Sequence, residues 1–165
     1  MKLDLKLSSA NIHVTPAVGT DPVSVVRFAE TLATGNGYDR VYCVFDRDGH
    51  AKFGDAINLV RQLGYYEIVS WPCFEIWLLL HFVYSTAPYN STGKQSACDI
   101  VVREVKKRFA EYVKGHRGVY SHLESKIDAA ITNARRLRQH NTSTNSYNSS
   151  TAVHELVDYL RKLKQ

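Results

Sequence analysis

The sequence predicts an α/β protein in which a short, mainly parallel sheet is flanked by helices and followed by a helical C-terminal half. Strand-like and helix-like patterns alternate between residues 11 and 71, as they do in βαβ units. Beyond Pro72, apolar residues recur about every four positions, which is typical of amphipathic helices. A chain of 165 residues suits one domain, with the α/β core at about 11–84 and the helical half at about 97–165.

The predicted core contains three strands and two helices. Asp21 and Pro22 form an N-cap and first helical position, and Gly35 breaks the helix that follows. Gly64 ends a second helix, as a favoured C′ residue. The strands are expected at residues 12–14, 41–45 and 66–71; the middle one is continuously apolar, as buried parallel strands are.

The helical half is predicted from stripes of apolar residues and contains no further strand. Residues 74–82 form a buried helix, and three amphipathic helices follow. Their stripes are Val101, Val105, Phe109 and Val113; Leu123, Ile127, Ile131 and Ala134; and Val153, Leu156, Val157, Leu160 and Leu163. Residues 85–96 and 140–150 are rich in Ser, Thr and Asn and are expected to be mobile loops.

Composition excludes several classes of protein. Hydrophobic residues make up 44% and charged residues 22%, close to globular averages. The first residues alternate charge with leucine, unlike a signal peptide, and the apolar run 76–83 is too short to cross a membrane. The three cysteines form no CxxC pair, which argues against a disulfide framework and a zinc site. We therefore expect a cytoplasmic protein.

A mild positive charge suggests an anionic partner such as DNA or RNA. The formal net charge is +5 and the pI about 9.1. Much of the excess lies in residues 103–108 and 135–138, which look like helix exteriors. These runs are either solvated helix faces or a nucleic-acid surface, and the sequence leaves both open.

An acidic cluster follows the most convincing strand. Asp46 and Asp48 form a D-x-D arrangement at the carboxyl end of that strand, where open parallel sheets bind ligands. Two such carboxylates suit Mg²⁺, with Mn²⁺ as an alternative. Arg47 between them would steady phosphate charge. The competing interpretation is an ordinary Asp-Arg-Asp-Gly turn.

Glu75 lies in the first turn of an otherwise apolar helix, four residues after the third strand. It is either a third metal ligand beside Asp46 and Asp48 or an acid that stabilises the helix N-terminus, an effect of about 0.3–1 kcal/mol. His81, on the same helix, is a candidate catalytic residue whose simpler interpretation is a hydrogen-bonded core histidine. Cys73 is interpreted as a buried thiol in preference to a nucleophile.

Four segments together resemble the RloB-like proteins. They are Val44–Asp48, Pro72–Phe82, Tyr112–Lys114, and Thr151–Val153 with Leu156–Val157. The long segment that contains Glu75 is highly specific, and the resemblance extends from about Gly19 to Leu163. Tyr112, Lys114 and Thr151 meet the acidic edge only if the helices fold back onto the sheet.

The resemblance implies a Toprim-like or Rossmann-like three-layer fold and a role in defence against phage, often beside an ATPase encoded nearby. Toprim-class proteins bind Mg²⁺ through an early glutamate and a D-x-D pair, which maps here onto Asp46 and Asp48. The family's early strand usually ends in a Cys-Glu-Gly-type motif, and this sequence starts after that motif. A truncated product and a natural variant both stay open.

These observations favour two functions. The first is a Mg²⁺-dependent nuclease that acts on DNA or RNA through Asp46, Asp48 and Glu75. The second is a non-catalytic sensor or adaptor that binds the ATPase through the helical half. A nucleotide-binding domain is a weaker third, because no Gly-rich loop opens a helix. Whether the chain forms a homo-oligomer stays open.

Overall fold

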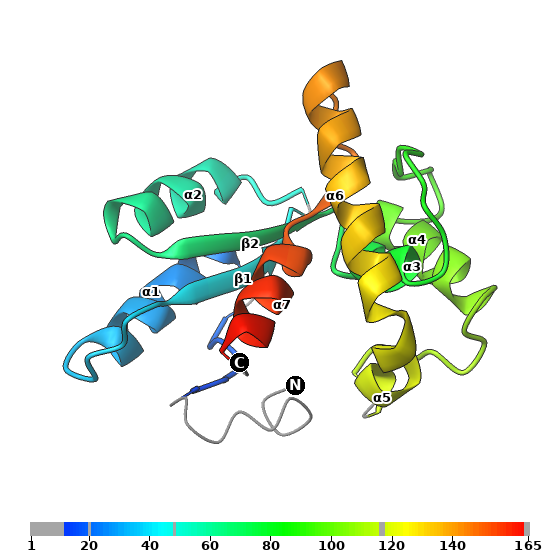
Figure 1. Cartoon of the computed structure of the whole chain (residues 1–165). Helices are drawn as coiled ribbons and strands as arrows, with labels where there is room; N and C mark the ends of the chain where they lie inside the picture. The colour runs from blue at the N-terminus through cyan, green and yellow to red at the C-terminus, as the bar shows by residue number, and fades with distance from the viewer. Residues whose placement is uncertain (1–11, 20, 48, 116–117, 164–165) are drawn as a thin grey trace.

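The computed structural model describes residues 12–19, 21–47, 49–115 and 118–163. Within them, two parallel strands lie among helices on one side of the molecule, and a cluster of helices forms the other side (Figure 1). The α/β class and the helical C-terminal half predicted from the sequence are confirmed. In chain order the elements are α1 (Pro22–Ala33), β1 (Tyr42–Asp46), α2 (Phe53–Gln62), β2 (Tyr66–Trp71), α3 (Glu75–Leu80), α4 (Ala97–Lys106), α5 (Val119–Leu123), the short 3-10 helix η1 (Glu124–Lys126), α6 (Ile127–Thr144), β3 (Ser150–Thr151) and α7 (Val153–Lys162).

The sheet is small and mixed. Its order is β1-β2-β3, with β1 and β2 parallel and β3 antiparallel to β2. The expected strand at residues 12–14 is wrong, because this segment forms no helix or strand and lies outside the sheet, and Val14 is 78% exposed. The expectation of no strand after Pro72 is also wrong, since β3 pairs Ser150 with Trp71 and Thr151 with Ser70.

Helices cover both faces of the strands, as a three-layer arrangement requires. On one face, α1 and α2 pack on β1 through Val26, Cys43, Phe45, Ala56 and Val60. Ile68 of β2 faces the opposite way and joins the larger core with α3, α4, α6 and α7. Because successive strand residues point to opposite faces, β2 contributes to both cores.

The local signals at α1 act as predicted. Asp21 caps the helix by accepting a hydrogen bond from the Ser24 N–H at 3.1 Å, and Pro22 is the first helical residue. Val26 is fully buried on its inner face. The predicted helix and its start are therefore confirmed.

The segment 140–150 differs from its predicted loop. The helix α6 continues to Thr144, and Asn145 ends it in the left-handed conformation with φ 50°. Asn141 is buried and donates to the Ser149 carbonyl at 2.8 Å, so a polar side chain fixes the turn into β3. Residues 85–96 do lack regular helices and strands, apart from one bridge between Thr92 and Gln95.

Candidate functional site

The acidic edge lies at the carboxyl end of β1. Asp46 is the last residue of the strand and is in register with Ser70 of β2. The next residue continues the pairing, since the Arg47 N–H donates to the Ser70 carbonyl at 2.8 Å. Asp48 lies outside the described residues, so the predicted D-x-D pair is seen only through Asp46.

Arg47 is held at this edge by aromatic rings. Its guanidinium carbon lies 3.9 Å from the centroid of the Trp71 ring and 5.1 Å from that of Phe53. A guanidinium over an aromatic face is attracted by the ring's quadrupole. The side chain is nevertheless exposed, so a fixed positive charge faces solvent beside Asp46.

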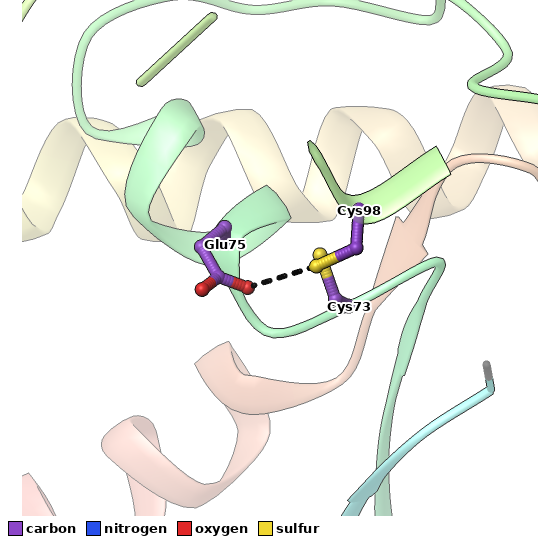
Figure 2. Close-up of side chains that lie close together, drawn as sticks. All are labelled: Cys73, Glu75 and Cys98. Atoms are coloured by element: carbon purple, nitrogen blue, oxygen red, sulfur yellow. Dashed lines mark hydrogen bonds between the residues drawn. The ribbon is translucent and has the colours of Figure 1, made fainter. Parts of the chain in front are cut away.

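Glu75 is buried among polar groups that come from distant parts of the chain. It is 4% exposed, and the Tyr112 hydroxyl donates to Oε1 at 2.9 Å. Lys114 Nζ lies 3.4 Å from the same oxygen, and Cys98 Sγ lies 3.6 Å from Oε2 (Figure 2). The segment that follows α4 thus folds back onto the start of α3, just past the end of β2. This folding back brings Tyr112 and Lys114 to Glu75.

These contacts keep the carboxylate ionised despite its burial. Burial alone would raise the pKa of Glu75, but a hydrogen bond from Cys73, a backbone N–H, the Lys114 charge and the Tyr112 hydroxyl together lower that pKa below its ordinary value. Burial and the Glu75 charge raise the pKa of Tyr112, so its hydroxyl remains a donor. The pKa of Lys114 is raised by the Cys98 contact and by Glu75, against the effect of burial, so it stays a cation.

Two thiols complete this cluster. Cys73 follows β2 and is 1% exposed; Cys98 lies in the first turn of α4 and is 8% exposed. A hydrogen bond between them, burial and Glu75 raise the pKa of Cys73, and the same bond together with Lys114 lowers the pKa of Cys98. The two sulfurs and a Glu75 carboxylate oxygen all lie within 4.8 Å of one another. We call Cys73, Glu75 and Cys98 the thiol-carboxylate cluster.

Asp46 and Glu75, two ligands of the predicted three-carboxylate metal site, lie at the end of β1 and at the start of α3. Asp46 lies at the edge of β1, Asp48 is not described, and the contacts of Glu75 given above are with the two cysteines, Tyr112 and Lys114. A shared cation between Glu75 and Asp46 stays a prediction. The alternative of a helix-terminal acid agrees with the position of Glu75 as the first residue of α3.

His81 lies in the core at the end of α3. It is 6% exposed, its Nδ1 lies 2.9 Å from the Trp77 carbonyl oxygen, and its ring meets the Trp77 ring edge-on at 4.8 Å. Burial lowers the pKa of His81, so the ring is neutral at pH 7. This placement agrees with a hydrogen-bonded core histidine, and a catalytic role for it stays a prediction.

Sequence reasoning missed Cys98 as a site residue and left Tyr112, Lys114 and Thr151 conditional. Tyr112 is separated from Glu75 by 37 residues, so no local spacing links them. Thr151 reaches the sheet as well, and its Oγ1 lies 2.8 Å from Ser70 Oγ. One signal was present for Tyr112, Lys114 and Thr151, which stand in the segments that resemble the RloB-like proteins; Cys98 stands in none of those segments.

The family comparison covers nearly the whole chain. The sequence matches the family model described as RloB-like protein over residues 2–160. The chain belongs to the RloB-like family. No curated protein and no solved structure matches this RloB-like chain. Within the described part of the chain, no helix combines the length and apolar character needed to span a membrane.

Proposed function

We propose that this RloB-like chain is a metal-dependent nuclease domain in which Asp46 and Asp48 hold Mg²⁺ or Mn²⁺. The observation that carries the proposal is the position of Asp46, at the carboxyl end of a strand paired in parallel with its neighbour. Ligands of open α/β sheets bind at this end of the strands. A defence role against phage follows from the family resemblance and forms part of the same proposal.

The side chains at this edge suit phosphodiester chemistry. A carboxylate oxygen such as that of Asp46 is a preferred Mg²⁺ ligand, and the ion completes its shell with water. Bound Mg²⁺ would polarise the scissile phosphate and supply an activated water. Arg47 is exposed and permanently charged, and its planar guanidinium matches two phosphate oxygens at once. Arg47 would therefore position the phosphate beside the carboxylates.

The charge of the chain supports a polyanionic substrate. The net charge is +5, and the basic side chains of the runs at residues 103–108 and 135–138 are exposed, as predicted. Arg135 and Arg138 form ion pairs with Asp158 and Glu155, so part of this charge is already compensated within the protein. The remaining field favours attraction of DNA or RNA without choosing between them.

The test compares nuclease activity of wild type with the double variant Asp46→Asn, Asp48→Asn. Supercoiled plasmid, single-stranded DNA and tRNA are incubated with Mg²⁺ or Mn²⁺, with a chelator control. We expect the double variant to lose cutting and the control Asp39→Asn, an exposed acid before the opposite end of β1, to retain it. Equal cutting by wild type and double variant would refute the proposal.

A second candidate is a non-catalytic adaptor that binds a partner ATPase through the helical half. The contacts of Glu75 favour this candidate. Its negative charge is already balanced by Lys114, and its carboxylate accepts a hydrogen bond from Tyr112. In this alternative, Glu75 has a structural role, and the acidic edge lacks a third metal ligand. Copurification with an ATPase encoded nearby, together with no cutting and no Mg²⁺ binding by wild type in calorimetric titration, would favour the adaptor.

A further inference from the structure

We propose that the thiol-carboxylate cluster is a binding site for a thiophilic divalent cation and that Zn²⁺ is the metal it binds in the cell. This inference does not depend on the nuclease proposal, which places Mg²⁺ on Asp46 and Asp48, and it assigns Glu75 to a second, separate metal. The cluster gathers three potential ligand atoms from the turn after β2, the start of α3 and the start of α4 (Figure 2). Each of the three residues is more than nine-tenths buried.

The spacing of the ligand atoms fits one tetrahedral ion. Zinc binds thiolate at about 2.3 Å and carboxylate at about 2.0–2.2 Å, so tetrahedral geometry separates the ligand atoms by about 3.5–3.8 Å. Cys98 Sγ and Glu75 Oε2 lie 3.6 Å apart, and all three ligand atoms lie within 4.8 Å of one another. Small side-chain rotations would therefore be enough to place a cation among them.

A cation already contacts the cluster. Lys114 Nζ lies 3.1 Å from Cys98 Sγ and 3.4 Å from Glu75 Oε1. A divalent ion with two thiolates and one carboxylate would carry a net charge of −1, which the Lys114 ammonium neutralises. The Lys114 side chain is 59% exposed, so its ammonium can also move toward solvent and leave room for a fourth ligand such as water. The charges of the site therefore balance with zinc bound.

Tyr112 would orient the carboxylate. Its hydroxyl donates to Oε1 of Glu75, while Oε2 faces the Cys98 sulfur. Hydrogen bonds of this kind from outside the ligand shell commonly fix the orientation of metal ligands. Tyr112 is 4% exposed and its pKa is raised, so the hydroxyl keeps its proton and remains a donor.

The donor atoms select the kind of metal. Thiolates favour Zn²⁺ and other thiophilic ions, whereas Mg²⁺ takes oxygen ligands and retains water. The sequence argued against zinc because no two cysteines are spaced as a local pair. The fold supplies the proximity instead, by packing α4 against α3.

The experiment is a Co²⁺ titration of the full chain, reduced and freed of metal. Tetrahedral thiolate-bound Co²⁺ gives visible d–d bands and an ultraviolet sulfur-to-metal charge-transfer band that grows with the number of thiolates. We expect saturation at one equivalent, displacement by Zn²⁺, and no displacement by excess Mg²⁺. Cys98→Ser should roughly halve the charge-transfer band. It should also weaken binding at least about tenfold, because loss of even an outer-shell partner of a metal ligand costs about 10–100-fold in affinity.

Two variants separate binding from folding. Cys43→Ser changes a thiol that is also buried, at 1% exposed, but lies in the other core, and it should leave the Co²⁺ spectrum unchanged. Glu75→Gln should keep the charge-transfer intensity of two thiolates and bind more weakly, with circular dichroism verifying its fold. The proposal would be overturned if the wild-type chain, with its three thiols shown to be reduced, gave no saturable Co²⁺ spectrum. Identical spectra for wild type and Cys98→Ser would also overturn it. Neither result bears on cutting by Asp46 and Asp48.

Discussion

His81 carries a prediction at the scale of a single residue. Burial lowers its pKa in the folded chain, and unfolding returns the ring to water, where its pKa is about 6.5. Below that pH, the unfolded chain binds a proton that the folded chain does not, so the free energy of unfolding falls as the pH decreases. The loss is at most about 1.4 kcal/mol per pH unit, and it ends at the lower folded pKa.

The measurement is urea unfolding of wild type and His81→Gln between pH 7.5 and pH 5. We expect the variant to be less stable at pH 7.5 and to lose less stability on acidification than wild type. His122→Gln changes an exposed histidine and should retain the wild-type dependence on pH. Parallel pH profiles for wild type and His81→Gln would show that burial of this ring does not drive the effect.

The sequence indicated part of the site at this scale. Glu75 is predicted as a site residue because a carboxylate is rare in an apolar helix turn, and in the structure it has buried polar partners. Asp46 at the end of β1 followed from a continuous apolar run. The contacts with Cys98, Tyr112 and Lys114 cross loops and other helices, so no periodicity or local motif could have predicted them.

The helix α4 carries the prediction at the scale of an element. Ser96 Oγ accepts from the Asp99 N–H, and Asp99 Oδ2 accepts from the Ser96 N–H, both at 3.1 Å. This capping box satisfies two backbone donors at the helix start, two residues before Cys98. Loss of such a cap costs about 1 kcal/mol of stability, and here it would also loosen the turn that holds Cys98.

Ser96→Ala should therefore lower the free energy of unfolding in urea by about 0.5–2 kcal/mol. Ser125→Ala alters an exposed serine in η1 and should stay within about 0.5 kcal/mol of wild type. If the two variants are equally stable, the cap contributes nothing and the start of α4 is fixed by packing of Val101 and Val105 instead.

Elements marked by local signals were predictable, whereas two short segments whose strand character depends on pairing were not. Asp21, the N-cap of α1, and Pro22, its first residue, are adjacent in the sequence, and they predicted the start of this helix correctly. Apolar and polar residues alternate at 12–14 as they do in a strand. Alternation alone does not provide a neighbouring strand to pair with, and this segment lies outside the sheet. Conversely, β3 is two residues long and exists because β2 pairs with it.

At the scale of the whole molecule, β2 joins the two cores. Val69 packs with α1 and α2, whereas Ile68 packs with the helical half. The C-terminal part of the chain attaches to this strand through β3, where Ser70 Oγ and Thr151 Oγ1 share a buried hydrogen bond of 2.8 Å. Thr151 Oγ1 also accepts from the Val153 N–H at the start of α7. One hydroxyl therefore connects the sheet to the last helix.

Thr151→Val keeps the shape of this side chain and removes the hydroxyl, which leaves Ser70 without that partner. A buried polar group deprived of its hydrogen bond costs about 1–3 kcal/mol, and we expect a loss of this size in urea unfolding. The exposed Thr132→Val on α6 should cost little. Adding Ser70→Ala to Thr151→Val should cost less than the sum of the single variants, because both changes remove the same bond. Strict additivity would instead mean that Ser70 and Thr151 stabilise their strands separately and that β3 is held by its backbone pairing alone.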